Sequence, residues 1–318
     1  MGIELLRALF PDGEDKLPRL KKEDDQAWAL NGFALFYARS GRPRGAVSLY
    51  KMSNKIEERR GYKKGLAIGL DNLAISQFLI GELDNAESNL MRSIEICREI
   101  KDERDEAISY EELIRLLAYR GNFEGSKKEF GKSLKLFTKL NHLQHQDIIF
   151  AYLSKCFLLI SNADEALNSA KKSRELSDIK HYERDIIRAE WLLGAAHLMK
   201  GNLIEVEKHL TEALIHDRKI NLVELEPDIL LEFAKLRFKQ NHKKEALKFA
   251  EEALQIADRC EYRLKQADIH NFLAVFYRDA GDLEKAREHG EIAKERAECG
   301  YKPALEKAKK VLDEIERG

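Results

Sequence analysis

A repeat of 40 residues constrains the fold of this chain more than any other sequence feature. It runs from Ala27 onward without an insertion. A turn residue, mostly glycine or asparagine, recurs in all seven units: Gly41, Gly81, Gly121, Ser161, Gly201, Asn241 and Gly281. Glycine and asparagine favour the left-handed conformation that ends a helix. Each unit is therefore predicted to be an antiparallel pair of helices around this turn.

Small residues recur at two further positions of every unit. Five residues after the turn the chain has Ala46, Ala86, Ser126, Ala166, Val206, Ala246 and Ala286. Twelve residues after the turn it has Ser53, Ser93, Ser133, Ser173, Ala213, Ala253 and Ala293. A large residue, such as Phe33 or Leu193, stands in the first helix of each unit. Large residues packing against small ones predict close contact between the paired helices.

The units are longer than the 34 residues usual for repeats of this kind. The proline that commonly ends the second helix is absent, and charged or polar residues such as Glu58 and Arg98 stand in its place. We therefore expect the six extra residues to lengthen both helices and also the loop between units.

The composition argues against some classes of binding partner and indicates a cellular compartment. The chain has 318 residues, with 55 Lys and Arg against 56 Asp and Glu. This balance argues against a nucleic-acid or anionic-membrane binder, since those need a basic field. No apolar run is long enough to span a membrane. The four cysteines lack CxxC spacing, which favours reduced thiols in a cytoplasmic protein.

The two ends differ from the repeats. Residues 1–23 are predicted to form a leader with a short helix, Ile3 to Phe10, that either packs on the first repeat or ends a linker. If the first unit is uncapped, Trp28, Leu30 and Phe33 would be exposed and would favour a homodimer through the N-terminal end. Residues 24–300 form the seven units. Residues 301–318 carry one apolar stripe and are predicted to be a capping helix.

The repeat pattern resembles the tetratricopeptide repeat (TPR) family over residues 24–318. It is most similar to the 40-residue repeats at the C-terminal end of bacterial and archaeal signalling NTPases of the NACHT or STAND type. The segments Glu23–Asn31, Tyr182–His197 and Asn221–Glu232 carry this likeness. The resemblance implies an all-α fold, an α-α superhelix (a TPR solenoid) of seven helix-turn-helix repeats with a C-terminal capping helix. It also implies a scaffold or a sensor arm.

Positions 2, 5, 9, 12 and 13 of each unit, counted from Ala27, Ala67 and so on, are expected to line the concave groove of such a superhelix. In units four and five these positions are largely apolar with cations at the border, which predicts a contact surface for a peptide or protein. Trp191 would be its centre, and basic residues would bind carboxylates. The predicted partner-binding residues are Arg115, Tyr119, Lys155, Leu158, Leu159, Arg188, Trp191, Leu198 and Met199. The alternative is that winding of the array, or the leader, buries these side chains within the protein.

No catalytic or metal-binding signature stands out. HExxH, GxSxG and Cys–His–Asn arrangements are absent, and Gly121–Lys128 lacks the spacing of a phosphate loop. His142 and His145 lack a third ligand and are interpreted as loop histidines. His197 and His270 replace core residues and are interpreted as buried, hydrogen-bonded groups.

These observations favour a non-enzymatic scaffold without cofactor or metal, which binds a peptide or protein partner in the groove. The alternative is a sensor or regulatory arm of a larger STAND or NACHT signalling NTPase. Hydrolase chemistry in the groove is the least favoured hypothesis, because the titratable residues do not converge in the pattern that such a site requires.

Overall fold

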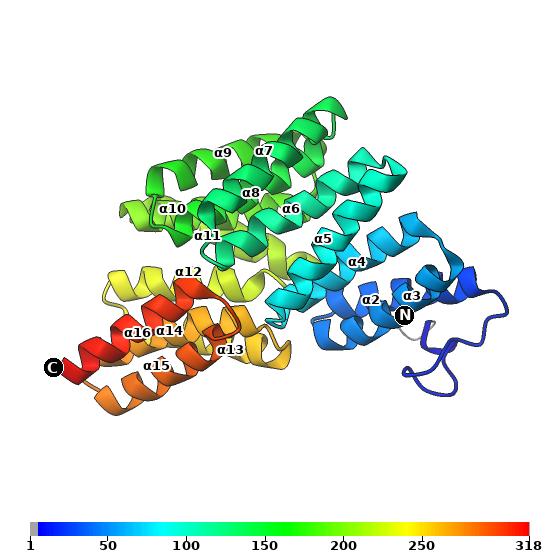
Figure 1. The fold of residues 1–318 in the computed structure, drawn as a ribbon. Coiled ribbons are helices and arrows are strands. Elements are labelled where there is room, and N and C mark those ends of the chain that lie inside the picture. Colours follow the sequence, from blue (N-terminus) through cyan, green and yellow to red (C-terminus); the bar gives the residue numbers. More distant parts are fainter. Residues whose placement is uncertain (1–5, 318) are drawn as a thin grey trace. The chain divides into compact units, whose positions relative to one another are not determined.

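The computed structural model describes residues 6–317, and within them it contains helices and turns but no strand. The helices follow one another in consecutive order (Figure 1). Their bounds are α2 Glu23–Arg39, α3 Pro43–Arg60, α4 Lys63–Leu79, α5 Leu83–Ile100, α6 Glu103–Tyr119, α7 Phe123–Lys139, α8 Leu143–Leu159, α9 Ala163–Lys180, α10 Glu183–Lys200, α11 Leu203–Ile220, α12 Glu226–Lys239, α13 Lys243–Arg259, α14 Arg263–Asp279, α15 Leu283–Ala297 and α16 Lys302–Arg317. The predicted all-α class and helix pairs are confirmed.

The chain divides into two compact units. One ends at Leu113 and the other begins at Ile114, so the boundary falls within α6. In the first, α2 packs on α3 and α4 on α5. In the second, α8 packs on α9, α10 on α11, α12 on α13 and α14 on α15.

The turn inside every repeat has the predicted left-handed residue. All seven turn residues have φ between 59° and 83°. A second left-handed residue follows the other helix of each pair, at a position without a recurring residue type. These residues are Gly61, Lys101, Asn141, His181, Asn221, Glu261 and Gly300. The same type of C-cap therefore closes both turns.

The expected longer loop between units is wrong. Only Gly61 and Tyr62 separate α3 from α4, and only Lys101 and Asp102 separate α5 from α6. The first of each pair takes the left-handed conformation that reverses the chain at once. The six extra residues are therefore taken up by the helices, most of which have 17 or 18 residues.

Serine hydroxyls explain one of the small-residue positions. Ser53 Oγ donates to the Ala27 carbonyl at 3.0 Å, and Ser93 Oγ donates to the Ala67 carbonyl at 3.1 Å. Each serine sits on the second helix of its pair and binds the start of the first. A serine here is small enough for close packing and satisfies its own hydroxyl.

The leader packs on the first repeat. Phe10 is 4% exposed and stacks on Phe33 with ring centroids 5.0 Å apart. Of the helix expected at residues 3–10, residues 3–5 lie outside the described part. Leu30 and Phe33 are buried, so their expected exposure in an uncapped first unit is wrong, whereas Trp28 is 72% exposed.

The C-terminal helix α16 covers α14 and α15. Its apolar stripe includes Val311 and Ile315, which join a cluster with Ala274 and Ala286. Tyr301, just before α16, is completely buried. Its ring packs on Tyr119 of α6, with centroids 4.6 Å apart. Residues from the two ends of the second compact unit therefore meet.

None of the described helices combines the length and the apolar character that crossing a bilayer requires. All four cysteines are free thiols, and Cys97, Cys156 and Cys260 are buried. Burial raises the pKa of Cys97 to about 12, so this thiol is protonated at neutral pH.

Candidate functional site

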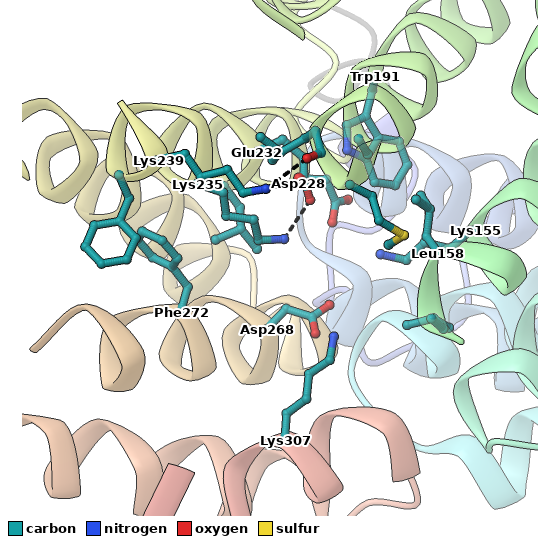
Figure 2. A pocket seen from close by; sticks show the side chains of 16 residues that line it. Lys155, Leu158, Trp191, Asp228, Glu232, Lys235, Lys239, Asp268, Phe272 and Lys307 are labelled. Atoms are coloured by element: carbon teal, nitrogen blue, oxygen red, sulfur yellow. Dashed lines mark hydrogen bonds and ion pairs between the residues drawn. The ribbon is translucent and has the colours of Figure 1, made fainter. Parts of the chain in front are cut away.

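A cavity of 310 Å³ lies within the second compact unit and is lined by the first helices of successive repeats (Figure 2). Six of the nine predicted binding residues contribute to it. These six are Lys155, Leu158, Leu159, Trp191, Leu198 and Met199. We call this cavity the α12 groove, because α12 contributes more of its lining than any other helix.

Most of the other lining residues also follow the position rule, although they are absent from the predicted set. Applied to the sixth unit, positions 2, 5, 9, 12 and 13 are Asp228, Leu231, Lys235, Phe238 and Lys239. All five line the α12 groove. The rule was applied only as far as the fifth unit, so the signal was present but unused.

One side of the α12 groove is apolar. Trp191 is 6% exposed and Leu198 4% exposed, and both pack in the core cluster that joins α8, α10 and α12. Met199 is 37% exposed, and Phe272 of α14 faces the same space (Figure 2). A ligand side chain placed here would contact rigid, packed residues.

Three carboxylates of the α12 groove already have partners. Glu232 accepts from Lys235 at 2.7 Å, Asp228 pairs with Lys265, and Asp268 accepts from Tyr301 Oη at 2.9 and 3.0 Å. These contacts fix the carboxylates on the chain's own donors. Their negative charge favours the charged form of the remaining lysines of the groove, but none of the three carboxylates forms a hydrogen bond or ion pair with those lysines.

Lys155 and Lys307 are those remaining cations. Neither ammonium group makes a hydrogen bond or ion pair with a described residue, whereas Lys239 donates to the Leu198 carbonyl at 3.0 Å. Lys155 Nζ lies 5.4 Å from the Trp191 ring centroid and 5.7 Å from that of Tyr119. Figure 2 shows both ammonium groups pointing into the cavity.

The pKa shifts of the two lysines differ in direction. Burial alone would lower the pKa of Lys155, but the attraction of Tyr119 and of the carboxylates Asp268 and Asp228 outweighs burial and raises the pKa. Desolvation of the Lys307 ammonium lowers its pKa, although its side chain is exposed; the carboxylate of Asp268 opposes this effect, and Lys235 and Lys155 add to it. An anionic group bound between the two lysines would favour the charged form of both.

A second cavity of 410 Å³ adjoins the first and shares Lys235, Asp268, Phe272 and Lys307 with it. It continues along α14 and α16 and is lined also by Asn271, Val275, Arg278, Lys310, Val311 and Glu314. Asn271 Nδ2 donates to the Ala304 carbonyl at 3.0 Å, so this amide holds α16 in place. The two cavities together suit an extended ligand better than a compact one.

Arg115, Arg188 and Tyr119 lie outside the lining of both cavities. The guanidinium of Arg115 lies 5.0 Å from the Tyr152 ring and 3.9 Å from Glu224, and Arg188 pairs with Asp185 at 3.0 Å. Their positive charges, with those of Arg184 and Lys265, hold the pKa of the half-buried Glu224 at about 2 despite its desolvation. The chain thus supplies its own carboxylates to both arginines, while Tyr119 packs against Tyr301.

The lining of both cavities contains lysines and carboxylates but no His, Cys or Ser among the described residues. Such a set can recognise charge and apolar shape. His142 precedes α8, but His145 lies within α8, so the interpretation of His145 as a loop histidine is wrong. Their rings lie beside the Phe137 ring, at 6.0 and 4.7 Å between centroids. His270 is buried, as interpreted from the sequence, and its Nδ1 lies 2.8 Å from Nδ1 of the half-buried His289.

No protein-family model and no curated protein sequence matches this chain. Among solved structures, the Rap conjugation gene regulator of plasmid pLS20, in complex with the Phr* peptide, is similar with a TM-score of 0.72. It is 10% identical over 94% of this chain and 78% of its own. Yeast Tom70 has a TM-score of 0.56 and is 16% identical, over 99% of this chain and 69% of its own.

Aspartyl phosphate phosphatase F from Bacillus subtilis has a TM-score of 0.53 at 9% identity, over 94% of this chain and 85% of its own. At such identities the likeness concerns the fold alone. Together with the helix pairs and their turns, it shows that this chain folds as an array of tetratricopeptide-type helical repeats.

Proposed function

We propose that this protein is a non-enzymatic interaction module that binds an extended segment of a protein or peptide in the α12 groove. One observation carries the proposal: two ammonium groups, Lys155 and Lys307, face an apolar-lined cavity without a hydrogen-bonding partner among the described residues. A ligand that places a carboxylate between them would supply the missing charge-assisted hydrogen bonds.

The apolar wall defines the rest of the ligand. An aromatic or large aliphatic side chain next to the carboxylate would cover Met199 and the exposed edge of Trp191. Buried aromatic anchors beside desolvated charges are typical of the residues that dominate binding energy. Arg115 and Arg188 are left out of the proposed contact set, because Glu224 and Asp185 already compensate them. The Rap regulator with a bound peptide is compatible with such a ligand for this fold.

The test is a peptide-display selection on the purified chain, with counter-selection on the double variant Lys155→Met and Lys307→Met. We expect enrichment of peptides with Asp or Glu beside an aromatic or large aliphatic residue. Their affinity, measured by fluorescence anisotropy, should fall at least tenfold in the double variant, which corresponds to about 1.4 kcal/mol.

Lys243→Met is the matched control, since Lys243 is an exposed lysine at the start of α13 outside both cavities. It should leave the affinity unchanged. Circular dichroism must show that all variants are folded. Selection of no peptide, or of peptides that bind the double variant equally well, would refute the proposed function.

A further inference from the structure

Two histidines and one glutamate converge in the fifth repeat, away from the α12 groove. His197 lies near the end of α10, and Glu205 and His209 lie one turn apart on α11. One ligand atom from each of these residues lies within 4.8 Å of the other two. The two imidazole rings stack with centroids 5.5 Å apart and an angle of 8° between their planes. His209 Nε2 lies 3.7 Å from Glu205 Oε2.

A second layer of residues orients the His209 ring. Its Nδ1 lies 2.6 Å from Glu190 Oε2, and Glu190 also accepts from Arg174 Nε at 2.5 Å. A carboxylate that accepts from one ring nitrogen fixes the tautomer and directs the other nitrogen outward as a ligand. Here that other nitrogen is Nε2, the atom that faces Glu205. Glu190 is only 4% exposed, so its position is set by packing as well as by these contacts.

His197 has a polar neighbour in Asn202. Its Nδ1 lies 3.3 Å from Asn202 Nδ2, and a flip of this amide would bring Oδ1 to the same place. With the oxygen toward the ring, Nδ1–H donates and Nε2 is free to bind a metal. The interpretation of His197 as a buried core group is wrong, because the side chain is half-buried and faces His209.

The local charges also permit a cation. Lys200, the nearest residue of α10 with a positive charge, forms an ion pair with Asp164. Lys171 also acts on His197, and the carboxylates of Glu190 and Glu205 oppose its charge.

We propose that His197, Glu205 and His209 bind a divalent transition-metal ion, with Zn²⁺ the best match, and that water completes a tetrahedral shell. Imidazole nitrogen and carboxylate oxygen bind Zn²⁺ at about 2.0–2.2 Å, which places ligand atoms about 3.3–3.6 Å apart in a tetrahedron. The 3.7 Å between His209 Nε2 and Glu205 Oε2 is already close to that spacing. A modest rotation of His197 would complete the site.

Such an ion would connect α10 to α11 within one repeat. Because binding to the folded state alone stabilises it by mass action, Zn²⁺ should raise the melting temperature of the chain. This inference is independent of the proposed ligand in the α12 groove, since no residue is shared between them.

The test uses the full chain, freed of metal by chelator and titrated with ZnSO₄ in a calorimeter. Co²⁺ gives a second readout, because tetrahedral coordination produces visible absorption. We expect one equivalent to bind, with the affinity lost at least a hundredfold in His209→Gln and in Glu205→Gln. Glu190→Gln should weaken binding by about 10- to 100-fold, as expected for a residue that orients a ligand.

The seventh repeat provides the matched control. His289 occupies the same repeat position as His209, but Lys285 stands where the fifth repeat has Glu205. His289→Gln should therefore leave the affinity and the Co²⁺ spectrum unchanged. Binding no tighter than millimolar in the native chain, or equal binding by His209→Gln, would overturn the proposal.

Discussion

Asp217 on α11 is a fully buried carboxylate, and neither oxygen finds a hydrogen bond among the described residues. Desolvation, reinforced by the charge of Glu226, raises its pKa from an ordinary 3.8 to about 7. The equivalent residues are apolar in four other repeats, as in Cys97 and Phe137, and polar in two, Glu57 and Ser177. Ser177 and Glu57 each have a hydrogen-bond partner, so Asp217 differs from them in having none among the described residues.

This shift gives Asp217→Asn a defined effect on stability. Between pH 4 and 7 the folded state binds a proton that the unfolded state releases, so the native chain loses stability as pH rises through this window. Asparagine removes this loss. At pH 8 the variant should be more stable by about 4 kcal/mol, the free energy that corresponds to a pKa raised from 3.8 to about 7, and near pH 4 the difference should vanish. Urea unfolding of the native chain and the variant measures the stability difference at pH 8 and at pH 4.

Asp313→Asn is the control, since Asp313 is exposed on α16. It should change stability little at either pH. If Asp217→Asn destabilises the chain equally at pH 4 and pH 8, the carboxylate is ionised in the folded state and the argument fails.

The repeat register placed most residues of the candidate site, but not their pairing. Positions 9, 12 and 13 of the units place Lys155, Leu158 and Met199 on one surface from sequence alone. That Arg115 would meet Glu224 depends on a turn before α12, where Pro227 delays the helix start to Glu226. A 40-residue period does not indicate which side chains of distant repeats contact each other.

At the scale of the element, the turn between repeats needs a left-handed backbone conformation, which residues other than glycine disfavour. Lys101 ends α5 with φ of 59° and ψ of 36°, a left-handed conformation that costs a side-chain-bearing residue about 1–2 kcal/mol. Glycine at Gly61 and Gly300 meets the same requirement without strain. Recurring glycine predicts the turn inside each repeat. No recurring residue type predicts the left-handed turn between repeats.

Lys101→Gly should therefore stabilise the chain by about 0.5–1 kcal/mol, because relief of the strained conformation exceeds the added entropy of the unfolded chain. The same exchange at Lys51, exposed in the middle of α3, should destabilise by about 1 kcal/mol. Thermal unfolding of the two variants gives the comparison. A loss of stability in both would mean that the turn conformation carries no strain.

At the scale of the whole molecule, the fold class followed from one local period, because each repeat packs mainly on its neighbours. The contact of Tyr301 with Tyr119 is different, since it joins residues far apart in the sequence. Tyr301 is buried against α6 and donates to Asp268, a lining residue of the α12 groove. No pairwise pattern in the sequence indicates this contact, which depends on the summed geometry of several repeats.

Tyr301→Ala should remove that long-range link and cost about 3–5 kcal/mol, whereas Tyr301→Phe keeps the ring and should cost about 1–3 kcal/mol through the lost hydrogen bond to a carboxylate. Hydrogen exchange read by mass spectrometry locates the effect. In Tyr301→Ala, faster exchange should appear in α16 and also in α6 after Ile114, although α6 is unchanged in sequence. Faster exchange confined to α14, α15 and α16 would show that the two ends of this unit are not coupled through Tyr301.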